Sequence, residues 1–313
     1  MRKFKAALLG YYGFGNLGDE LLLQACIDIL ARNGIKREEV LVLSNNPEET
    51  SQTFNVKSIN RWKYRDVMSA FRETETLILG GGGLFQDVTS VKSCVWYWGI
   101  IRLAKLFGVK LLAWGQSIGP LNSKLSKFLA GDALRLCGKI HVRDDNSLKL
   151  AENLGCKNVV KGNDLVMTLK PDMSRRAENS QEKFMLINLR PHAKLEAFIN
   201  ILKPHINNNV IGAALSAEDE EPLRLAGIDR IIRVRNFQEA GALWSGASSA
   251  VGMRLHFGVL SRIFRTPLAL MPYDVKVSEF AKNSNVPCIV DEWREPVMPR
   301  EIPEDVCGEI LSL

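Results

Sequence analysis

The sequence predicts an α/β protein made of two doubly wound parallel sheets that face each other across a cleft. Apolar runs of strand length alternate with segments of helical period, which is the order expected of repeated βα units. Most of these runs end in glycine or in a polar turn. The length of 313 residues corresponds to about two domains of roughly 150 residues each.

The first half of the chain is predicted to form apolar strands separated by helices. Parallel strands are buried on both faces, so continuous apolar runs are expected rather than strict alternation. The predicted strands are Phe4–Leu9, Val40–Leu43, Thr76–Leu79, Lys110–Trp114, Lys139–Val142 and Asn158–Val160. The predicted helices are Leu21–Asn33, Val95–Phe107, Ser123–Cys137 and Ser147–Leu154.

A polar, proline-containing stretch without apolar period, Lys170–Lys183, separates the two halves. We expect domains at residues 1–172 and 183–313, with the last helix packing back on the first domain. The predicted strands of the second half are Phe184–Leu189, Val210–Leu215, Arg230–Val234, Ala250–Met253, Leu268–Met271 and Cys288–Val290. The predicted helices are Ala193–Leu202, Phe237–Ser245 and Leu255–Phe264, and a further helix opens at Lys276.

The composition is that of an ordinary globular protein, with 46% apolar and 24% charged residues, and it excludes disorder and a small disulfide scaffold. The six cysteines show no CxxC spacing and the four histidines no finger spacing, so we expect reduced thiols and no metal site. The N-terminus lacks the pattern of a signal peptide, and the most apolar stretch is interrupted by basic residues. We therefore expect a cytoplasmic protein.

The first predicted strand runs through a glycine-rich loop into a helix. Gly13, Gly15 and Gly18 satisfy G-x-G-x-x-G, which in Rossmann-like domains brings backbone N–H groups to a phosphate. The second strand lacks the acidic residue that would hold a dinucleotide ribose, so a dinucleotide is disfavoured. The alternative is a turn in which Asn16 or Asp19 only caps the helix.

Two aromatic residues in this loop, Tyr12 and Phe14, favour a binding site over a plain turn. A second glycine run, Gly80–Gly83, and the segment Trp114–Pro120 also follow predicted strands. Ligands bind at the carboxyl edge of such sheets, so the three strand ends are expected to converge on one site. The expected contacts include the backbone at Gly15, Asn16, Gly82 and Gly83.

Cations also stand at strand ends. Arg143 follows Lys139–Val142, and it is either a partner of Asp144 or Asp145 or a guanidinium available for a carboxylate or phosphate. His141, inside the strand, is expected to be a packing residue.

In the second half, Arg254 and His256 stand at a junction of strand and helix, and Arg190 ends another strand. Lys276 opens a helix, where the helix dipole disfavours a cation unless an anion is near. The alternatives are a buried, satisfied imidazole for His256 and a solvated surface lysine for Lys276.

Seven motifs, in order along nearly the whole chain, resemble the polysaccharide pyruvyl transferase family. The resemblance is greatest to its CsaB type, which acts on secondary cell-wall polymer precursors in bacteria with S-layers. The motifs are GYYGFGNLGDE (Gly10–Glu20), LGGGGLFQD (Leu79–Asp87), WGQSIGP (Trp114–Pro120), VRDDNS (Val142–Ser147), INLRPH (Ile187–His192), GMRLHFGVLS (Gly252–Ser261) and MPYDVKV (Met271–Val277). The chain is short for this group and compact over Lys170–Lys183, so its acceptor loops are expected to differ.

The resemblance implies a fold similar to two-domain glycosyltransferases of the B type. It implies transfer of pyruvate from phosphoenolpyruvate to a sugar as a cyclic ketal, and it assigns donor and catalytic positions to Tyr12, Phe14, Arg143, His256 and Lys276, with Arg254 adjacent. The implied acceptor is a lipid-linked disaccharide that ends in N-acetylmannosamine, modified across O4 and O6. Phosphoenolpyruvate is a co-substrate, and no cofactor is expected.

The residues agree with this chemistry. A donor with a carboxylate and a phosphate requires several cations in fixed geometry, which Arg143, Arg254 and Lys276 could supply. The reaction also requires a group that passes protons, and the imidazole of His256 fits that requirement. The alternatives are a nucleotide-sugar glycosyltransferase and a non-enzymatic scaffold module, and the oligomeric state, including a homo-oligomer, stays open.

The net charge of +6 indicates an anionic partner. No basic repeat with interleaved aromatic residues is present, so nucleic acid is not expected. Basic residues around Trp96, Tyr97 and Trp98 suggest peripheral contact with the inner membrane face, and the alternative is a solvated helix face over a packed core. These basic residues are Lys92, Arg102, Lys105 and Lys110.

Overall fold

The computed structural model describes residues 2–88, 90–171 and 183–303. Within them the chain forms two compact units, of which unit 1 contains residues 2–14 and 19–168, and unit 2 contains residues 15–18, 169–171 and 183–303. The expected linker Lys170–Lys183 and the expected C-terminal helix lie largely outside the described residues.

Unit 1 is built on a seven-stranded parallel sheet with the strand order β3-β2-β1-β4-β5-β6-β7. The strands are β1 (Phe4–Leu9), β2 (Val40–Ser44), β3 (Lys57–Asn60), β4 (Thr74–Phe85), β5 (Lys110–Ile118), β6 (Lys139–Val142) and β7 (Val159–Lys161). The helices are α1 (Leu17–Arg32), α2 (Pro47–Phe54), α3 (Tyr64–Arg72), α4 (Lys92–Leu106), α5 (Lys124–Leu134) and α6 (Asp145–Asn153).

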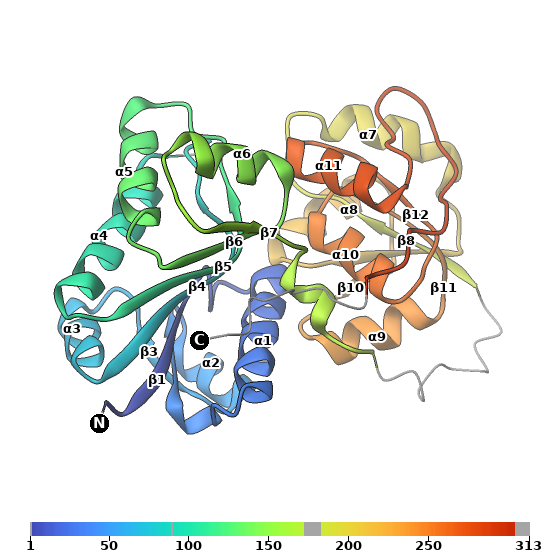
Figure 1. Ribbon diagram of the computed structural model, residues 1–313. Coiled ribbons are helices and arrows are strands. Elements are labelled where there is room, and N and C mark those ends of the chain that lie inside the picture. The colour runs from blue at the N-terminus through green and yellow to red at the C-terminus, as the bar shows by residue number, and fades with distance from the viewer. Residues whose placement is uncertain (1, 89, 172–182, 304–313) are drawn as a thin grey trace. The chain divides into compact units, whose positions relative to one another are not determined.

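Helices cover both faces of this sheet. Buried side chains of β1, β2, β4 and β5 form one core with residues of α3, α4, α5 and α6, while α1 and α2 lie on the opposite face (Figure 1). The central strands β1 and β2 are almost wholly buried, as expected of parallel strands enclosed by helices. Side-chain caps begin several helices, for example Ser123 for α5 and Asp144 for α6, whose oxygens accept backbone N–H groups of the first turn.

Unit 2 contains a five-stranded parallel sheet with the order β10-β9-β8-β11-β12. The strands are β8 (Phe184–Asn188), β9 (Val210–Ala214), β10 (Ile231–Arg233), β11 (Ala247–Gly252) and β12 (Leu268–Leu270). The helices are α7 (Leu195–Leu202), α8 (Glu220–Leu225), α9 (Phe237–Ser245), α10 (Leu255–Ile263) and α11 (Val275–Ser284). Short 3₁₀ turns lie at Arg37–Glu39, Leu165–Thr168, Lys203–His205 and Ala217–Asp219.

The predicted α/β class with parallel sheets is confirmed in both units. The largest omission is the segment 47–72, which forms α2, β3 and α3. The residues of α2 and β3 are mostly polar, whereas Tyr64, Val67, Met68 and Phe71 have the i, i+3, i+4, i+7 spacing of one helix face, so the sequence does carry a signal for α3. The short helix α8 was also not predicted. The predicted strand at Cys288–Val290 is wrong, because Cys288 makes only an isolated bridge with Leu270.

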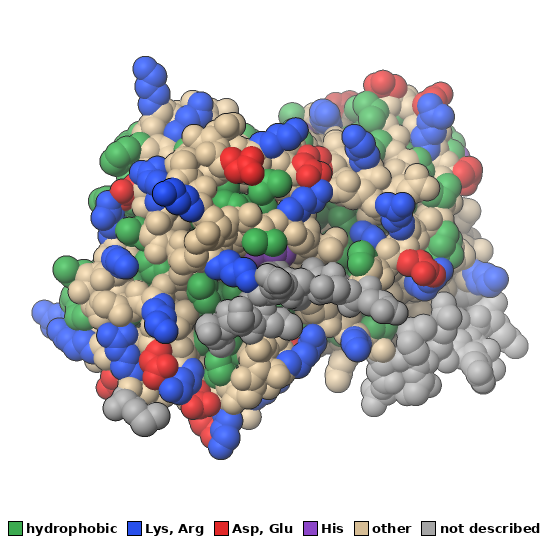
Figure 2. All heavy atoms as spheres, in the orientation of Figure 1, with side chains coloured by type: hydrophobic (Ala, Val, Ile, Leu, Met, Phe, Trp, Pro, Cys, Tyr) green, Lys and Arg blue, Asp and Glu red, His purple; other side chains and the backbone are tan. Residues whose placement is uncertain are grey.

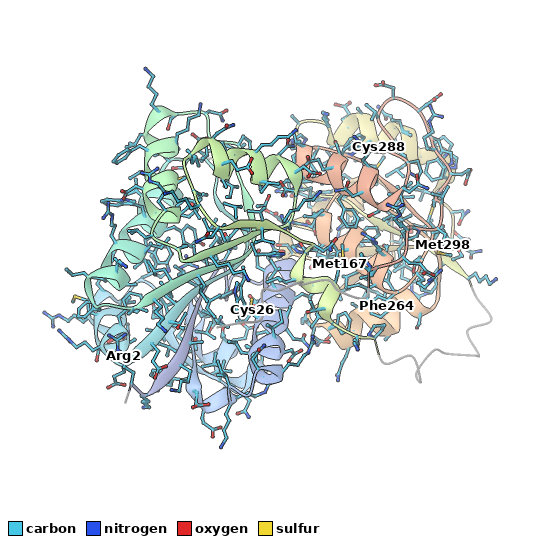
Figure 3. All side chains as sticks on the ribbon, viewed as in Figure 1. Arg2, Cys26, Met167, Phe264, Cys288 and Met298 are labelled. Atoms are coloured by element: carbon cyan, nitrogen blue, oxygen red, sulfur yellow. The ribbon has the colours of Figure 1, made fainter. Side chains whose placement is uncertain are left out.

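The cysteines of the described residues form no disulfide. Cys26 lies on α1, where it is fully buried, and Cys288 is half-buried; both are labelled in Figure 3. No helix of the described residues is long and apolar enough to cross a membrane.

Candidate functional site

The loop after β1 is held against β4 by a buried tyrosine. Tyr12 is 1% exposed, and its hydroxyl donates to the carbonyl oxygen of Gly80 over 2.7 Å. A Cβ at Gly10 would lie 2.3 Å from Tyr12 Cζ, and one at Gly80 would lie 2.0 Å from Tyr12 Oη. Glycine is therefore required at both positions because the tyrosine ring fills the space that a side chain would need. The aromatic residue expected to contact substrate is a structural anchor for two glycine-rich segments.

The second glycine run lies inside β4, which corrects the expectation that it follows the strand. Gly80 pairs with Trp114 and Gly82 with Gln116 of β5, and a register shift follows between Gly82 and Phe85. Gly81 and Gly82 both have φ of +84°, in the left-handed region that glycine adopts without strain. The strand thus continues through a bulge, and β5 likewise extends beyond its predicted end to Ile118.

Side chains of the same segment engage some backbone N–H groups of the loop after β1. The Gly13 N–H donates to Glu20 Oε1 over 2.8 Å, and the Gly18 N–H donates to Asn16 Oδ1 over 3.2 Å. These contacts support the capping alternative for Asn16. Burial raises the pKa of Glu20 to about 7, although the Gly13 N–H stabilises its charged form. A carboxyl that titrates near neutrality therefore stands at the base of the loop.

Phe14 belongs to an aromatic cluster around a buried arginine that was not predicted as a site residue. Its ring stacks on Tyr11 at 3.9 Å and lies 5.4 Å from the guanidinium of Arg61. Arg61 is 2% exposed, and it donates to Gly10 O over 2.6 Å and to Tyr97 Oη over 3.2 Å. None of the ion pairs among the described residues involves Arg61. The cluster thus holds a buried positive charge next to the loop after β1.

Arg143, at the end of β6, is paired with a carboxylate that lies further along the chain. Its Nη1 donates to Asp164 Oδ2 over 2.7 Å, and the two side chains are 7% and 4% exposed. The two partners expected from the sequence have other contacts. Asp144 caps α6 and accepts a hydrogen bond from the hydroxyl of Ser117, and Asp145 pairs with Lys161. Arg143 therefore forms an ion pair within the protein, as one of the two alternatives predicted, but its partner is Asp164.

His141 is confirmed as a packing residue. It is 1% exposed, and its Nδ1 accepts the N–H of Gly115 over 2.9 Å. Burial lowers its pKa to about 4, so the ring is neutral at physiological pH.

In unit 2, a buried ionic cluster lies at the ends of the strands β8, β9 and β11. Arg254 Nε donates to both carboxylate oxygens of Asp219, at 2.8 and 2.7 Å, and its Nη2 lies 2.5 Å from Glu218 Oε1. Asp219 is fully buried, whereas the side chain of Glu218 is 50% exposed. Burial opposes the charge on Arg254, but the hydrogen bonds and charges of Asp219 and Glu218 outweigh it and raise the pKa of the guanidinium.

Arg190 joins the same cluster. Its Nη1 donates to Tyr273 Oη over 3.0 Å, and its Nη2 lies 3.7 Å from Glu218 Oε1. Burial raises the pKa of Tyr273 although Arg190 acts in the opposite direction. The structure thus brings the predicted cations Arg190 and Arg254 to one glutamate oxygen. That oxygen marks a position where an anionic group meets two guanidinium groups.

His256 and Lys276 each occupy the second residue of a helix, α10 and α11 respectively. Gly18 belongs to unit 2 and lies next to His256. A Cβ at residue 18 would lie 2.1 Å from His256 Nδ1, so only glycine allows the imidazole this position. Asp274 caps α11 by accepting the N–H of Val277 over 3.0 Å. Both side chains are half-buried.

Four charged residues of these clusters were not predicted: Arg61, Asp164, Glu218 and Asp219. Glu218 and Asp219 follow a predicted strand in an acidic run, which was a usable signal. Arg61 follows a strand too polar to be recognised, and Asp164 lies 21 residues from its partner. Among the described residues, no three His, Cys, Asp or Glu side chains are grouped so that they could hold a metal ion.

A family sequence model described as "Polysaccharide pyruvyl transferase" matches residues 16–275, and this match decides the family. The chain belongs to the polysaccharide pyruvyl transferase family. It is therefore a transferase of a family that modifies polysaccharides. A search of curated protein sequences gives no significant match.

Solved structures similar to this pyruvyl transferase family member show its fold. A glycosyltransferase from Rickettsia africae aligns with a TM-score of 0.57 at 10% identity, covering 93% of this chain and 86% of that one. The UDP-GlcNAc 2-epimerase from Methanocaldococcus jannaschii aligns with a TM-score of 0.60 at 9% identity, covering 92% and 89%. Sucrose-phosphate synthase from Thermosynechococcus elongatus aligns with a TM-score of 0.53 at 13% identity, covering 86% and 81%. The predicted fold, similar to glycosyltransferases of the B type, is confirmed.

Proposed function

We propose that this pyruvyl transferase moves pyruvate from phosphoenolpyruvate to two hydroxyls of one sugar as a 4,6-ketal and releases phosphate. The observation that carries the proposal is the family match over residues 16–275. The proposed acceptor is the terminal N-acetylmannosamine of a lipid-diphosphate-linked cell-wall polymer precursor, as in the CsaB type. Phosphoenolpyruvate acts as co-substrate, and the proposal includes no cofactor.

The cluster at the strand ends of unit 2 supports an anionic donor. Arg190 and Arg254 meet at Glu218 Oε1, at 3.7 and 2.5 Å, and Glu218 is half exposed whereas Asp219 is fully buried. An incoming carboxylate or phosphate can replace the half-exposed side chain of Glu218, while Asp219 keeps Arg254 in place. In the proposal, Glu218 therefore stands where an oxygen of the donor binds.

The proposed reaction balances without a redox step. The methylene carbon of phosphoenolpyruvate gains a proton, one sugar hydroxyl adds to C2 and loses its proton, and phosphate leaves. The second hydroxyl then adds to C2 and closes the ketal, and its proton is passed to the released phosphate. We assign the proton transfers to His256, because an imidazole can both accept and donate a proton, and charge stabilisation to Lys276 and Arg143.

Two glycine-rich segments supply further proposed substrate contacts. Phe14, Gly15 and Asn16 would line the sugar or donor, as would the backbone at Gly82 and Gly83. Tyr12 contributes by holding Gly80, since its hydroxyl is already hydrogen bonded inside the protein. The pair of Arg143 with Asp164 orients the guanidinium rather than leaving it mobile.

The test is phosphate release from phosphoenolpyruvate by the purified full chain, with a diphosphate-linked disaccharide ending in N-acetylmannosamine. We expect acceptor-dependent release and a ketal-bearing product by mass spectrometry. His256→Asn should lower kcat by at least 100-fold, whereas the matched variant His205→Asn, whose ring stacks on Trp293, should retain activity. Transfer from a UDP-sugar without phosphoenolpyruvate would instead establish a glycosyltransferase. Equal activity of the two histidine variants would refute the role of His256.

A further inference from the structure

An apolar groove lies on unit 1 between the start of α3 and the first half of α4. Its cavity volume is about 490 Å³, and it is lined by Tyr64, Val91, Lys92, Val95, Trp96, Trp98, Gly99 and Ile100. Neither the loop after β1 nor the cluster around Arg254 contributes a lining residue. The groove therefore belongs to a surface that the proposed reaction does not use.

Large side chains with an apolar body and a polar tip surround the groove. Trp62 and Tyr64 are 49% and 56% exposed, and Val95 is 45% exposed. Trp62 Nε1 donates to Asn45 over 2.8 Å, so the ring is held at the surface. Tryptophan and tyrosine with this exposure are typical of the interface between water and a lipid bilayer.

The aromatic residues are supported from below by Arg61. Its guanidinium lies 4.0 Å from the ring of Trp96 and 5.2 Å from that of Trp62, and the two tryptophans lie 5.3 Å apart. Cation–π contacts of this kind keep the rings in fixed positions. The groove is thus a preformed apolar surface whose rings are held in place before any partner binds.

The charge around the groove is strongly positive. Residues 61–72 and 90–106, which contain α3 and α4, include seven Lys or Arg residues and one acidic residue, Asp66. Their net charge of +6 equals that of the whole chain, so the other residues together are neutral. Lys63, Arg65 and Lys92 are exposed, and Figure 2 shows basic and hydrophobic side chains next to each other over α3 and α4.

We propose that this groove and its basic rim form a docking surface for a bilayer of anionic phospholipid. Exposed lysines and arginines attract the negative surface, the aromatic rings enter the headgroup region, and the groove accepts an acyl chain. The combination of apolar lining and unbalanced positive charge favours a lipid surface over a second copy of this chain, which would carry the same charge. The inference goes beyond the proposed function and requires no assumption about the reaction.

The test is co-sedimentation of the full chain with vesicles, without donor or acceptor. We expect binding to vesicles of phosphatidylglycerol mixed with phosphatidylcholine, and a strong decrease with added salt. The variant Lys63→Glu/Lys92→Glu should lower the partition coefficient on the order of 25-fold or more. Tyr64→Ser/Val95→Ser should lower it about 5-fold or more and leave the salt dependence unchanged.

The matched control is Lys157→Glu/Lys203→Glu, which alters the net charge equally at two exposed lysines that do not line the groove. It should bind within about twofold of the wild type, and thermal melts of all variants confirm folding. Equal loss of binding in the control and the groove variant would overturn the proposal, as would equal binding to vesicles of phosphatidylcholine alone. Self-association that the groove variants abolish, with no vesicle binding by the wild type, would overturn it in favour of a second copy.

Discussion

The guanidinium of Arg254 and the carboxylate of Asp219 form a buried ion pair in which Nε lies 2.7 Å from Oδ2. Asp219 Oδ2 also accepts the backbone N–H groups of Leu215 and Ser216, at 3.0 and 3.2 Å. Asn188, at the end of β8, lies 3.3 Å from the same oxygen through its Nδ2. One carboxylate therefore ties the ends of β8 and β9 to Arg254, and it fixes the direction of the guanidinium.

Replacing this carboxylate should be costly. Asp219→Asn removes the charge that balances Arg254, and breaking a buried pair on one side typically costs about 3–5 kcal/mol. We expect a loss of about 3 kcal/mol in the free energy of unfolding by urea denaturation. The control Glu292→Gln breaks an exposed pair with Arg294 and should cost less than about 0.5 kcal/mol. A similar small effect for both variants would show that Arg254 does not depend on Asp219.

Glu218→Gln should strengthen anion binding. The side chain of Glu218 is 50% exposed and its Oε1 contacts both Arg190 and Arg254, so a donor anion must displace it. Removing its charge should cost little stability and should lower the dissociation constant for phosphoenolpyruvate about fivefold, as expected for a partly exposed pair worth roughly 1 kcal/mol. Isothermal titration calorimetry measures the constant, with Glu221→Gln, on the neighbouring helix α8, as the control. Weaker binding by the Glu218 variant would show that the glutamate itself contacts the donor.

The fold could be predicted where burial is uniform. Strands such as β1 and β2 are enclosed on both faces, so their apolar runs stand out from the flanking turns. The edge strand β3 has the sequence KSIN and is only partly buried, so nothing in its composition separates it from a loop. The sequence predicts that the glycine run follows the strand Thr76–Leu79, whereas in the structure Gly81 and Gly82 form a bulge within β4.

For the candidate site, the sequence predicts which charged residues lie at strand ends, but not which of them contact one another. Sequence places Arg190 and Arg254 at carboxyl edges, but it does not show that both meet Glu218. For Arg143 the sequence offers only the neighbouring Asp144 and Asp145 as ion-pair partners, because spacing along the chain gives no information on a partner in the segment after β7. Pairing across a sheet depends on strand order, which became evident only from the structure.

Tyr12 and Gly80 should be energetically coupled. Tyr12→Phe removes the donor to Gly80 O and leaves a buried carbonyl unsatisfied, at a cost of about 1–2 kcal/mol. Gly80→Ala places a Cβ 2.0 Å from Tyr12 Oη but 3.3 Å from Cζ, so most of the clash involves the hydroxyl. We expect the alanine to cost at least about 1 kcal/mol less in the Tyr12→Phe background. Urea denaturation of the four proteins measures the coupling. Gly99→Ala, in α4 with no atom within 4 Å of the new methyl, controls for a glycine replacement.

If the two substitutions were additive, the hydroxyl of Tyr12 would not be what excludes a side chain at residue 80. Additivity is the rule for distant sites, so a coupling above about 0.5 kcal/mol is diagnostic of direct contact. The Gly99 control should change the free energy of unfolding in the stabilising direction by up to about 1 kcal/mol, because alanine is the better helix former.

Glu20 should make stability depend on pH near neutrality. Burial raises its pKa in the folded protein from 4.5 to about 7, so between these values the folded state binds the proton that the unfolded state has released. The contribution of Glu20 to stability is thus present below about pH 4.5 and falls as pH rises towards 7, by about 2–3 kcal/mol. Glu20→Gln keeps an acceptor for the Gly13 N–H but removes the titration. The variant should therefore be more stable than the wild type at pH 8.

The measurement is the difference in free energy of unfolding between Glu20→Gln and the wild type from pH 4.5 to 8. The difference should grow in favour of the variant as pH rises and become constant above about pH 7.5. Since both proteins share every other titrating group, the difference isolates Glu20. Glu38→Gln, at an exposed glutamate in the 3₁₀ turn Arg37–Glu39, is the control and should give a nearly flat difference. A flat difference for Glu20→Gln as well would mean that Glu20 is ionised in the folded protein throughout this range, and that its contact with Gly13 stabilises the charge more than burial opposes it.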